Sequence, residues 1–330
     1  MSKFLKETIL SFLRKSSHTI NIRTYSRQNK SNLLDLNTFF QNNTLHLLSA
    51  DIKQNERRQN KNLSVNNNIN KLYYYKKEFE KNVEIKKMIN NYIINGNELL
   101  MNEEEFNKAY QQIKEDITKN KNSVDSPIAI ILGGQPGAGK SNIYKIARKR
   151  FDNNLVELDC DAFRVYHPYY QQIKLMFGKE DGVKTNPFIF KAVDMLVEEL
   201  SNEKYNLIIE SSLKRSKTAI NNGKMLPPKG YEVELHVMAT NKEISWQGTI
   251  NRYYEEMRKN GKPRAVPKDF HDEVISNICN SLNEVKQSGL MTNILMFDRK
   301  QNCLYNMKED RDVDPSILLD QIINGRINYF

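Results

Sequence analysis

The chain has 330 residues, of which 39% are apolar, and carries a formal net charge of +10 at neutral pH. A chain of this length can bury a sizeable core and can hold more than one domain, which excludes disorder throughout. Its apolar runs, such as residues 8–13 and 128–132, are far shorter than the roughly 20 residues that cross a bilayer. We therefore expect no membrane span.

The cysteines and the N-terminus predict a cytoplasmic protein. Cys160, Cys279 and Cys303 are odd in number and widely spaced, which argues against both a disulfide framework and a zinc site. The first 15 residues place charges of both signs around a short apolar run, a pattern unlike a cleaved signal peptide. We expect reduced thiols in the cytoplasm.

The positive charge is concentrated near the N-terminus. The first 99 residues hold 17 Lys and Arg against 8 Asp and Glu, whereas the remaining residues hold 33 against 32. A basic arm can attract RNA, a membrane surface or an acidic partner, because such attraction does not depend on sequence. A solvated basic surface is the commoner reason for such a charge run, so we do not expect nucleic acid as the main partner.

Residues 1–95 are predicted to form a basic, mainly helical region. Residues 4–13 place their apolar side chains on one helical face, and the apolar side chains of residues 72–94 recur every three to five positions. Between them, residues 54–70 are dominated by Asn, Gln and charge, which predicts a linker or mobile loop and a site for a domain boundary.

Residues 96–330 are predicted to form an α/β domain. Asn102 and the three glutamates after it are typical of a helix start, and the apolar run over 128–132 predicts a strand buried on both faces. The alternation that follows predicts a parallel sheet flanked by helices. The predicted strands are 155–158, 206–209, 232–239 and 294–297, and the predicted helices are 142–150, 187–200, 244–257, 270–285 and 315–323.

A phosphate-binding loop lies between the first predicted strand and its helix. Residues 134–141 read GQPGAGKS, which fits the pattern GxxxxGK[ST] at every fixed position. In such a loop, backbone amides and a helix N-terminus surround phosphate oxygens, the lysine reaches the β- and γ-phosphates, and the hydroxyl binds Mg²⁺. We expect ATP to bind at Gly134, Gln135, Pro136, Gly137, Ala138, Gly139, Lys140 and Ser141, with Ser141 as the metal ligand.

The loop indicates a nucleotide but not a reaction, because one scaffold serves switches, motors and kinases. Residues 241–244 read NKEI and lack the Asp of a guanine-reading signature, which disfavours a GTPase. Carboxylates at the ends of predicted strands favour a kinase, since Asp159 and Asp161 follow the second strand and Glu210 ends the third. Either Asp could accept the proton of an acceptor hydroxyl, and each acid could instead cap a helix.

Two arginines and an aromatic cluster are further candidates. Arg252 lies in a predicted helix and Arg264 in a loop containing Gly and Pro, where either could stabilise phosphate charge, although solvated arginines are commoner. His167 lies among tyrosines 166, 169 and 170. These rings could form a pocket for a base, but a packed cluster is about twice as common at such spacing.

A series of motifs follows in order between Glu103 and Tyr305: EEFNKAY, SPIAIILGGQPGAGKS, LDCDAFRVYHP, YNLIIESSL, YEVELHVMA, GTINRY, RAVPKDFHD and ILMFDR. In these motifs and their order the sequence resembles the zeta toxin family of bacterial toxin-antitoxin systems, which are P-loop kinases of UDP-N-acetylglucosamine. The resemblance implies Asp161 as the catalytic base and Glu210 and Ser212 as contacts of the sugar nucleotide. It also implies Lys140, Arg252 and Arg264 as catalytic phosphate contacts.

The resemblance leaves the acceptor and the role of residues 1–95 open. The family often has an Arg where this chain has Lys214, which cannot make a two-pronged guanidinium contact. NAD, a nucleoside or a polynucleotide 5′ end is therefore an alternative acceptor, and a nucleotide-gated binding protein with a basic arm is a second alternative. Because helical antitoxins block the ATP site of zeta toxins, residues 1–95 could restrain a kinase domain formed by residues 96–330, or an antitoxin could bind in trans.

Overall fold

The computed structural model describes residues 62–260 and 265–327. The chain's contacts divide it into two compact units, Met1–Lys87 and Met88–Phe330. The helix predicted over residues 4–13 lies outside the described residues.

Helix α4 spans Asn62–Ile94, and the division between the units falls within it. It confirms the helix predicted over 72–94. Residues 62–70 are helical too, so the linker predicted over 54–70 is wrong for this part, while residues 54–61 lie outside the described residues. Extending a helix costs much less than starting one, which explains how a polar segment with little to bury can continue it.

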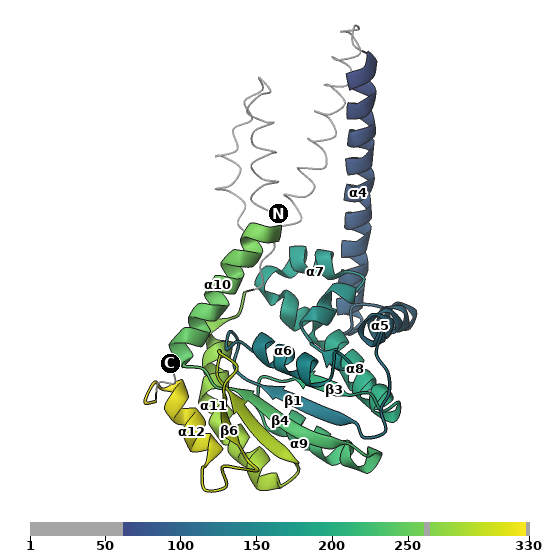
Figure 1. The fold of residues 1–330 in the computed structure, drawn as a ribbon. Helices are drawn as coiled ribbons and strands as arrows, with labels where there is room; N and C mark the ends of the chain where they lie inside the picture. Colours follow the sequence, from purple (N-terminus) through teal and green to yellow (C-terminus); the bar gives the residue numbers. More distant parts are fainter. Residues whose placement is uncertain (1–61, 261–264, 328–330) are drawn as a thin grey trace. The chain divides into compact units, whose positions relative to one another are not determined.

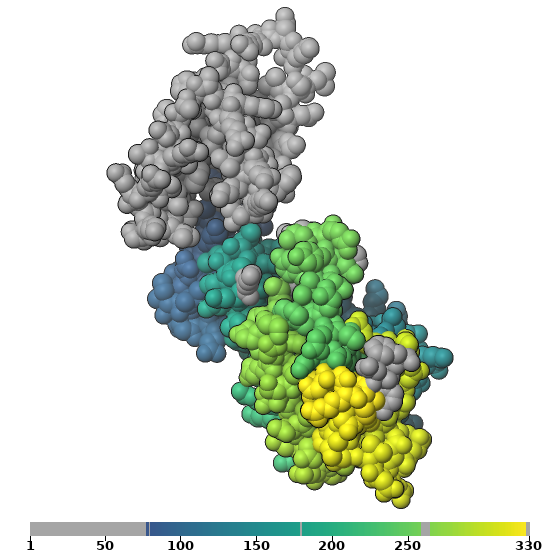
Figure 2. All heavy atoms as spheres, turned by 90° about the vertical axis from the view of Figure 1, so that its left-hand side faces the viewer, coloured from purple at the N-terminus to yellow at the C-terminus, as the bar shows by residue number. Residues whose placement is uncertain are grey.

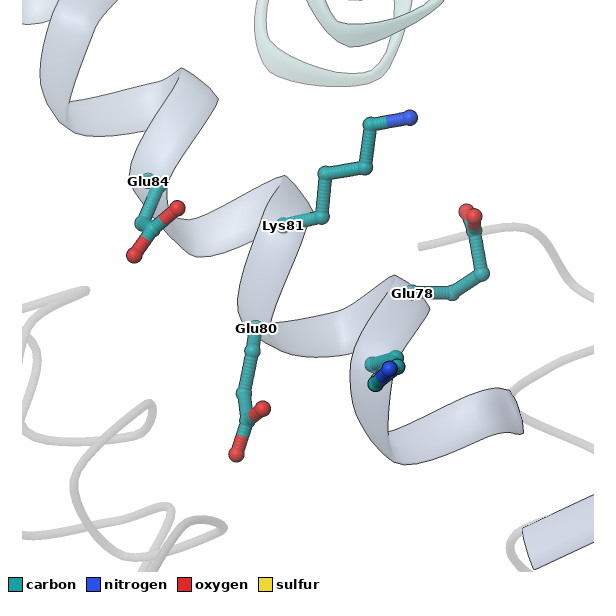
Figure 3. A pocket seen from close by; sticks show the side chains of 5 residues that line it. Glu78, Glu80, Lys81 and Glu84 are labelled. Atoms are coloured by element: carbon teal, nitrogen blue, oxygen red, sulfur yellow. The ribbon is translucent and has the colours of Figure 1, made fainter. Parts of the chain in front are cut away.

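A shallow hollow on α4 in the first unit is lined, among the side chains that the structure describes, by charged residues (Figure 3). They are Lys77, Glu78, Glu80, Lys81 and Glu84. These side chains project from the helix in different directions and carry both signs of charge. Small-molecule sites need polar groups that converge within a largely apolar pocket, so this hollow is not a candidate site.

The second unit contains a six-stranded sheet with the order β2-β3-β1-β4-β5-β6. Its first five strands are parallel, as predicted, and β6 pairs antiparallel with β5 at the edge. The strands are β1 (Ile128–Gly133), β2 (Val156–Leu158), β3 (Leu207–Glu210), β4 (Glu232–Met238), β5 (Asn293–Phe297) and β6 (Cys303–Asn306). The α/β fold class is therefore confirmed.

Helices cover both faces of this sheet, with α6 above it and α9 below it in Figure 1. The α-helices are α5 (Glu103–Thr118), α6 (Ser141–Arg150), α7 (Tyr170–Phe177), α8 (Asp181–Asn202), α9 (Lys217–Met225), α10 (Lys242–Asn260), α11 (Lys268–Ser288) and α12 (Pro315–Ile323). Short 3₁₀ helices are η1 (Ala162–Tyr166), η2 (Gly178–Glu180) and η3 (Pro227–Lys229). Helices α7 and α9 and strand β6 are not among the elements predicted from the sequence.

The start of α5 follows the predicted chemistry. The Asn102 side chain accepts a hydrogen bond from the Glu105 amide at 2.8 Å, and the Glu105 carboxylate accepts one from the Asn102 amide at 2.9 Å. This reciprocal pair satisfies two amides that a helix start would otherwise leave unpaired. Phe106, Tyr110 and Ile113 then lie on the buried face of the helix.

The sheet register aligns the carboxyl ends of the central strands. Leu132 of β1 lies opposite Glu210 of β3, and Gly133 lies opposite Val237 of β4. Ligands of open α/β sheets bind outside these ends, which makes this edge the place for a site. Helices α11 and α12 pack together, and they lie with α10 on the face of the second unit seen in Figure 2. Among the described residues, no helix is both long and apolar enough to cross a membrane.

Candidate active site

The phosphate loop connects β1 directly to α6, which is the predicted context. Gly134, Gly137 and Gly139 have φ angles of 148°, 74° and 103°. Residues with a Cβ atom rarely adopt such angles, so the loop requires glycine at these three positions. Turns of this kind let successive backbone amides face one anion.

Residues that follow β4 in the chain hold the loop in shape. Gln135 is fully buried, and its Nε2 donates to the Thr240 carbonyl at 2.7 Å, while the Thr240 hydroxyl donates to the Ala138 carbonyl at 2.8 Å. Helix α10 touches the loop directly, because a Cβ added to Gly248 would lie 2.5 Å from the Gly137 carbonyl oxygen. The loop is therefore preformed by its neighbours.

The loop lysine meets the glutamate at the end of β3. Lys140 Nζ donates to the Gly134 carbonyl at 3.0 Å and lies 3.0 Å from Glu210 Oε1. The Tyr144 hydroxyl, from the first turn of α6, donates to Glu210 Oε2 at 3.1 Å. Burial, together with the charge of Glu210, raises the pKa of Tyr144, so this hydroxyl stays a donor. The structure thus brings the predicted Lys140 and Glu210 together.

The two aspartates after β2 have different environments. Asp159 Oδ1 accepts the amide of Asp161 at 3.0 Å and that of Ala162 at 3.3 Å, which makes it the cap of the following turn. Burial and then the charge of Glu210 raise the pKa of Asp159. The Asp161 side chain is 42% exposed. Both aspartates are partly exposed, but one oxygen of Asp159 is already committed to the turn that it caps.

Arg164 holds Asp161, and the sequence analysis missed it. Its Nε lies 3.1 Å from Asp161 Oδ1, and its Nη1 and Nη2 donate to Thr185 Oγ1 at 2.6 Å and Asn186 Oδ1 at 2.8 Å. Its Nη1 also donates to the Gly182 carbonyl at 2.9 Å. Arg164 thereby joins the predicted base to the first turns of α8. A spacing of three residues between an acid and an arginine is the signal that could have revealed this pair.

In the turn after Glu210, both serine side chains accept hydrogen bonds from nearby backbone amides. Ser211 Oγ accepts the Leu213 amide at 3.2 Å, and Ser212 Oγ accepts the Lys214 amide at 3.3 Å. Each hydroxyl still has its own proton to donate, so Ser212 retains one polar group for a ligand. Lys214 turns to α11, where its Nζ lies 2.8 Å from Glu273 Oε2.

The predicted arginines fall on and beside α10. Arg252 is half-buried and lies four residues after Gly248, one helical turn beyond the contact with the phosphate loop. Arg264 lies outside the described residues. The structure adds Arg299, which the sequence analysis did not select. A Cβ at Gly139 would lie 3.5 Å from its Cγ and Nε, and Asn142 Nδ2 donates to its carbonyl at 2.8 Å.

The aromatic cluster after Asp161 is packing and not a pocket for a base. His167 is buried, its Nδ1 accepts the Tyr169 amide at 3.1 Å, and its Nε2 donates to the Leu99 carbonyl at 2.9 Å. Burial lowers the pKa of His167 to about 4, so the ring is neutral. The commoner of the two interpretations is correct here.

A second histidine contacts a serine beside the phosphate loop. His271 Nε2 lies 2.9 Å from Ser245 Oγ, and Asp272 Oδ1 lies 3.3 Å from His271 Nδ1. The Ser245 hydroxyl also lies within donating distance of the Lys242 carbonyl, at 2.9 Å. Its single proton therefore has two possible acceptors, and this contact alone assigns no nucleophile.

The protein groups suit a metal ion that binds mainly through phosphate. In residues 62–260 and 265–327, no cluster of three His, Cys, Asp or Glu side chains could hold a metal ion by itself. Ser141 is exposed at the start of α6. Mg²⁺ typically takes one or two protein ligands and completes its shell with substrate phosphates and water, so this set fits it. Cys160, Cys279 and Cys303 are free thiols, as expected.

The family model and the sequence relatives that match this chain point to the same family. A family model described as Zeta toxin matches residues 111–310. The chain is similar to Toxin PezT of Streptococcus pneumoniae serotype 4, with 36% identity over 207 residues that cover 62% of this chain and 82% of the relative. It is similar to Toxin zeta of Streptococcus pyogenes, with 30% identity over 228 residues that cover 68% of this chain and 79% of the relative.

Solved structures agree with the sequence relatives. A structure of the PezAT chromosomal toxin-antitoxin system of Streptococcus pneumoniae has a TM-score of 0.64 and 31% identity, over 69% of this chain and 90% of that chain. A complex of AvrRxo1-ORF1 and AvrRxo1-ORF2 with sulphate ions has a TM-score of 0.50 and 15% identity, over 69% of this chain and 74% of that chain. The second likeness concerns the fold alone.

Proposed function

Since the chain belongs to the zeta toxin family, we propose that it is a kinase that transfers the γ-phosphate of ATP to a sugar hydroxyl of UDP-N-acetylglucosamine. The observation that carries the proposal is the contact between Lys140 and Glu210, with Nζ 3.0 Å from Oε1. It joins the phosphate loop to the carboxylates at the neighbouring strand ends. A kinase needs this proximity of a phosphate site and acidic groups that can bind a hydroxyl.

On the donor side, the loop residues 134–141 would hold the phosphates of ATP. The amides of the loop and the N-terminus of α6 supply partial positive charge, and Lys140 supplies a full one. Ser141 would hold Mg²⁺, which neutralises charge on the β- and γ-phosphates when it is bound. Arg252 and Arg264 would contact the transferring phosphate as fixed donors that remain charged.

On the acceptor side, Asp161 would take the proton from the attacking hydroxyl. Its exposure and its ion pair with Arg164 support this assignment, whereas Asp159 already caps a turn. Glu210 and the hydroxyl of Ser212 would bind the sugar nucleotide. Phosphoryl transfer depends mainly on holding the hydroxyl in line with the γ-phosphate and on stabilising the charge that develops there.

The consequence of this reaction in a bacterial cytoplasm would be the loss of a cell-wall precursor. Such an activity must be restrained, either by an antitoxin in trans or by residues 1–95 in cis. Similarity to Toxin PezT and to the PezAT toxin-antitoxin system supports an antitoxin-type partner.

A kinase of another nucleotide acceptor is the second candidate. One observation favours it: Lys214 stands where the family often has an Arg, and it is engaged with Glu273 at 2.8 Å. A lysine with one ammonium group cannot bind a phosphate in the two-pronged manner of a guanidinium group. The acceptor could then be NAD, a nucleoside or a polynucleotide 5′ end, with the same base and the same phosphate loop.

The test is phosphate transfer by the full chain. We expect γ-labelled ATP with Mg²⁺ to label UDP-N-acetylglucosamine within a panel of UDP-sugars, NAD and nucleosides. Asp161→Asn should lose most of this transfer yet still bind ATP, and Asp125→Asn, which removes an exposed carboxylate before β1, should keep it. Label on NAD or a nucleoside alone would favour the second candidate. Full activity of Asp161→Asn would refute the base assignment. No product from either the full chain or the chain that begins at Met88 would favour the nucleotide-gated binding protein.

A further inference from the structure

The ion pair between Lys140 and Glu210 connects two ligand sites that the proposed reaction keeps separate. The Lys140 side chain is 16% exposed and that of Glu210 is 21% exposed. In a pair so shielded from water, removal of one partner leaves a poorly solvated charge that needs another partner. If Lys140 moves from Glu210 to a phosphate, the Glu210 carboxylate loses its ion-pair partner and needs another.

The carboxylate of Glu210 is held at both oxygens. Lys140 occupies Oε1, and the buried Tyr144 hydroxyl donates to Oε2 at 3.1 Å. Asp159 lies close enough for the charge of Glu210 to raise its pKa, second only to the effect of burial. Lys140 therefore offsets negative charge at the very place where an acceptor would have to bind.

From this arrangement we infer that the Lys140–Glu210 ion pair makes the two substrates bind cooperatively. Nucleotide phosphates draw Lys140 away from Glu210, and the released carboxylate then accepts a hydrogen bond from a hydroxyl of the second substrate. The inference rests on the proposed function in its assignment of ATP to the loop and of an acceptor to Glu210. Because coupling between two ligands is reciprocal, each substrate strengthens the binding of the other by the same factor.

The nucleotide half of the inference can be tested without knowledge of the acceptor. The affinity of the full chain for a non-hydrolysable ATP analogue with Mg²⁺ is measured by calorimetry. Glu210→Gln should bind the analogue at least about fivefold more tightly than the wild type, since the nucleotide no longer competes for Lys140. Glu157→Gln removes a carboxylate that pairs instead with Arg148 on the surface, and it should bind like the wild type.

A double-mutant cycle separates competition for Lys140 from simple charge repulsion. In a Lys140→Ala background, Glu210→Gln should no longer tighten analogue binding, because there is no lysine left to release. An equal gain in both backgrounds would mean that Glu210 merely repels the phosphates, and it would overturn the inference. No gain in either background would overturn it as well. A wild-type chain that does not bind the analogue would instead refute the proposed function.

The part of the inference that concerns the acceptor is tested with Lys140→Ala. This variant frees Glu210 permanently, so without nucleotide it should bind UDP-N-acetylglucosamine more tightly than the wild type does. Loss of a positive charge would by itself weaken the binding of a diphosphate, so a gain cannot come from general electrostatics. In the wild type, saturating ATP analogue should produce a similar gain. Weaker or unchanged binding by a Lys140→Ala chain with wild-type circular dichroism would contradict the inference.

Discussion

Arg164 sets the position of the proposed base and should matter for turnover more than for binding. Its guanidinium group contacts Asp161, Thr185 and Asn186, so Arg164→Ala frees the Asp161 carboxylate to move. A displacement of about 1 Å in an active site can cost roughly 10²-fold in rate. We expect Arg164→Ala to lower kcat by about that factor with little change in the KM for ATP.

Steady-state kinetics would check this expectation, with Arg148→Ala as the control because Arg148 pairs with Glu157 at the surface. Added guanidinium should restore part of the activity of Arg164→Ala if the lost group acts through Asp161. A raised KM for ATP with normal kcat would contradict a role in positioning the base.

The sequence could predict the phosphate loop because its chemistry depends on residues at fixed spacing in one short segment. It could not choose between Asp159 and Asp161, since both follow the same strand and only their hydrogen bonds differ. Arg299 could not be predicted for another reason. It follows strand β5, far along the chain from Gly139, and only the folded sheet brings the two residues together.

Glu234 should make the stability of the domain depend on pH. Burial alone would raise its pKa, but hydrogen bonds from His236 at 2.8 Å and from Arg150 outweigh burial and lower it from 4.5 to about 2. Glu234 therefore stabilises the folded state above its unfolded pKa, and this contribution is lost as the pH falls from 4.5 towards 2. Arg150 is partly exposed, so the contribution should be about 1–3 kcal/mol.

Urea unfolding at neutral pH and near the lower limit of this range would measure the effect. Glu234→Gln should be less stable than the wild type at neutral pH, and the difference should shrink in acid. Glu232→Gln, an exposed position on the same strand, should follow the wild type at both pH values. A constant difference between Glu234→Gln and the wild type would refute the pH dependence.

At the scale of elements, the contact between α10 and the phosphate loop depends on one missing side chain. A Cβ at Gly248 would lie 2.5 Å from the Gly137 carbonyl oxygen, closer than atoms can pack. Gly248→Ala must therefore push the loop or the helix away, and we expect kcat/KM for ATP to fall roughly tenfold to hundredfold. Gly182→Ala in α8 is the matched control, since a Cβ there meets no atom within 4 Å. Equal activity of the two variants would show that the loop tolerates the shift.

The elements that the sequence predicted have apolar patterns that are visible in the local sequence. Strand β1 is a continuous apolar run, and α12 begins and ends at the predicted residues. The missed elements α7, α9 and β6 each bury only one apolar side chain, namely Ile173, Ala219 and Tyr305, so tertiary contacts form them more than local pattern does. Residues 62–70 show the opposite case, in which a helix continues through a segment with few apolar residues.

At the scale of the whole molecule, the segment that matches the family model and the segment that carries the excess positive charge are separate. The family model matches residues 111–310, whereas the excess of positive charge lies in the first 99 residues. The basic region therefore lies outside the part that the family defines. A region added to a kinase of this kind can serve as its regulator, and the sequence analysis proposed that residues 1–95 restrain the kinase in cis.

A test of this restraint removes the N-terminal segment, and the packing of the last turns of α4 decides where the chain should be cut. Ile89 is fully buried and the Tyr92 hydroxyl donates to Glu105 Oε2 at 3.3 Å, so both belong to the packing of the second unit. Removing residues 1–95 would expose that packing and could lower activity for reasons unrelated to restraint. A cut between Lys87 and Met88 follows the division of the contacts instead.

We expect the chain that begins at Met88 to phosphorylate its acceptor faster than the full chain at equal concentration and with an equal unfolding temperature. Adding the 1–87 segment in trans should slow it again, since a restraining segment acts by binding and depends on its concentration. High salt should weaken the restraint if the basic residues supply the attraction. Equal rates for both chains at all salt concentrations would show that residues 1–87 do not restrain the kinase.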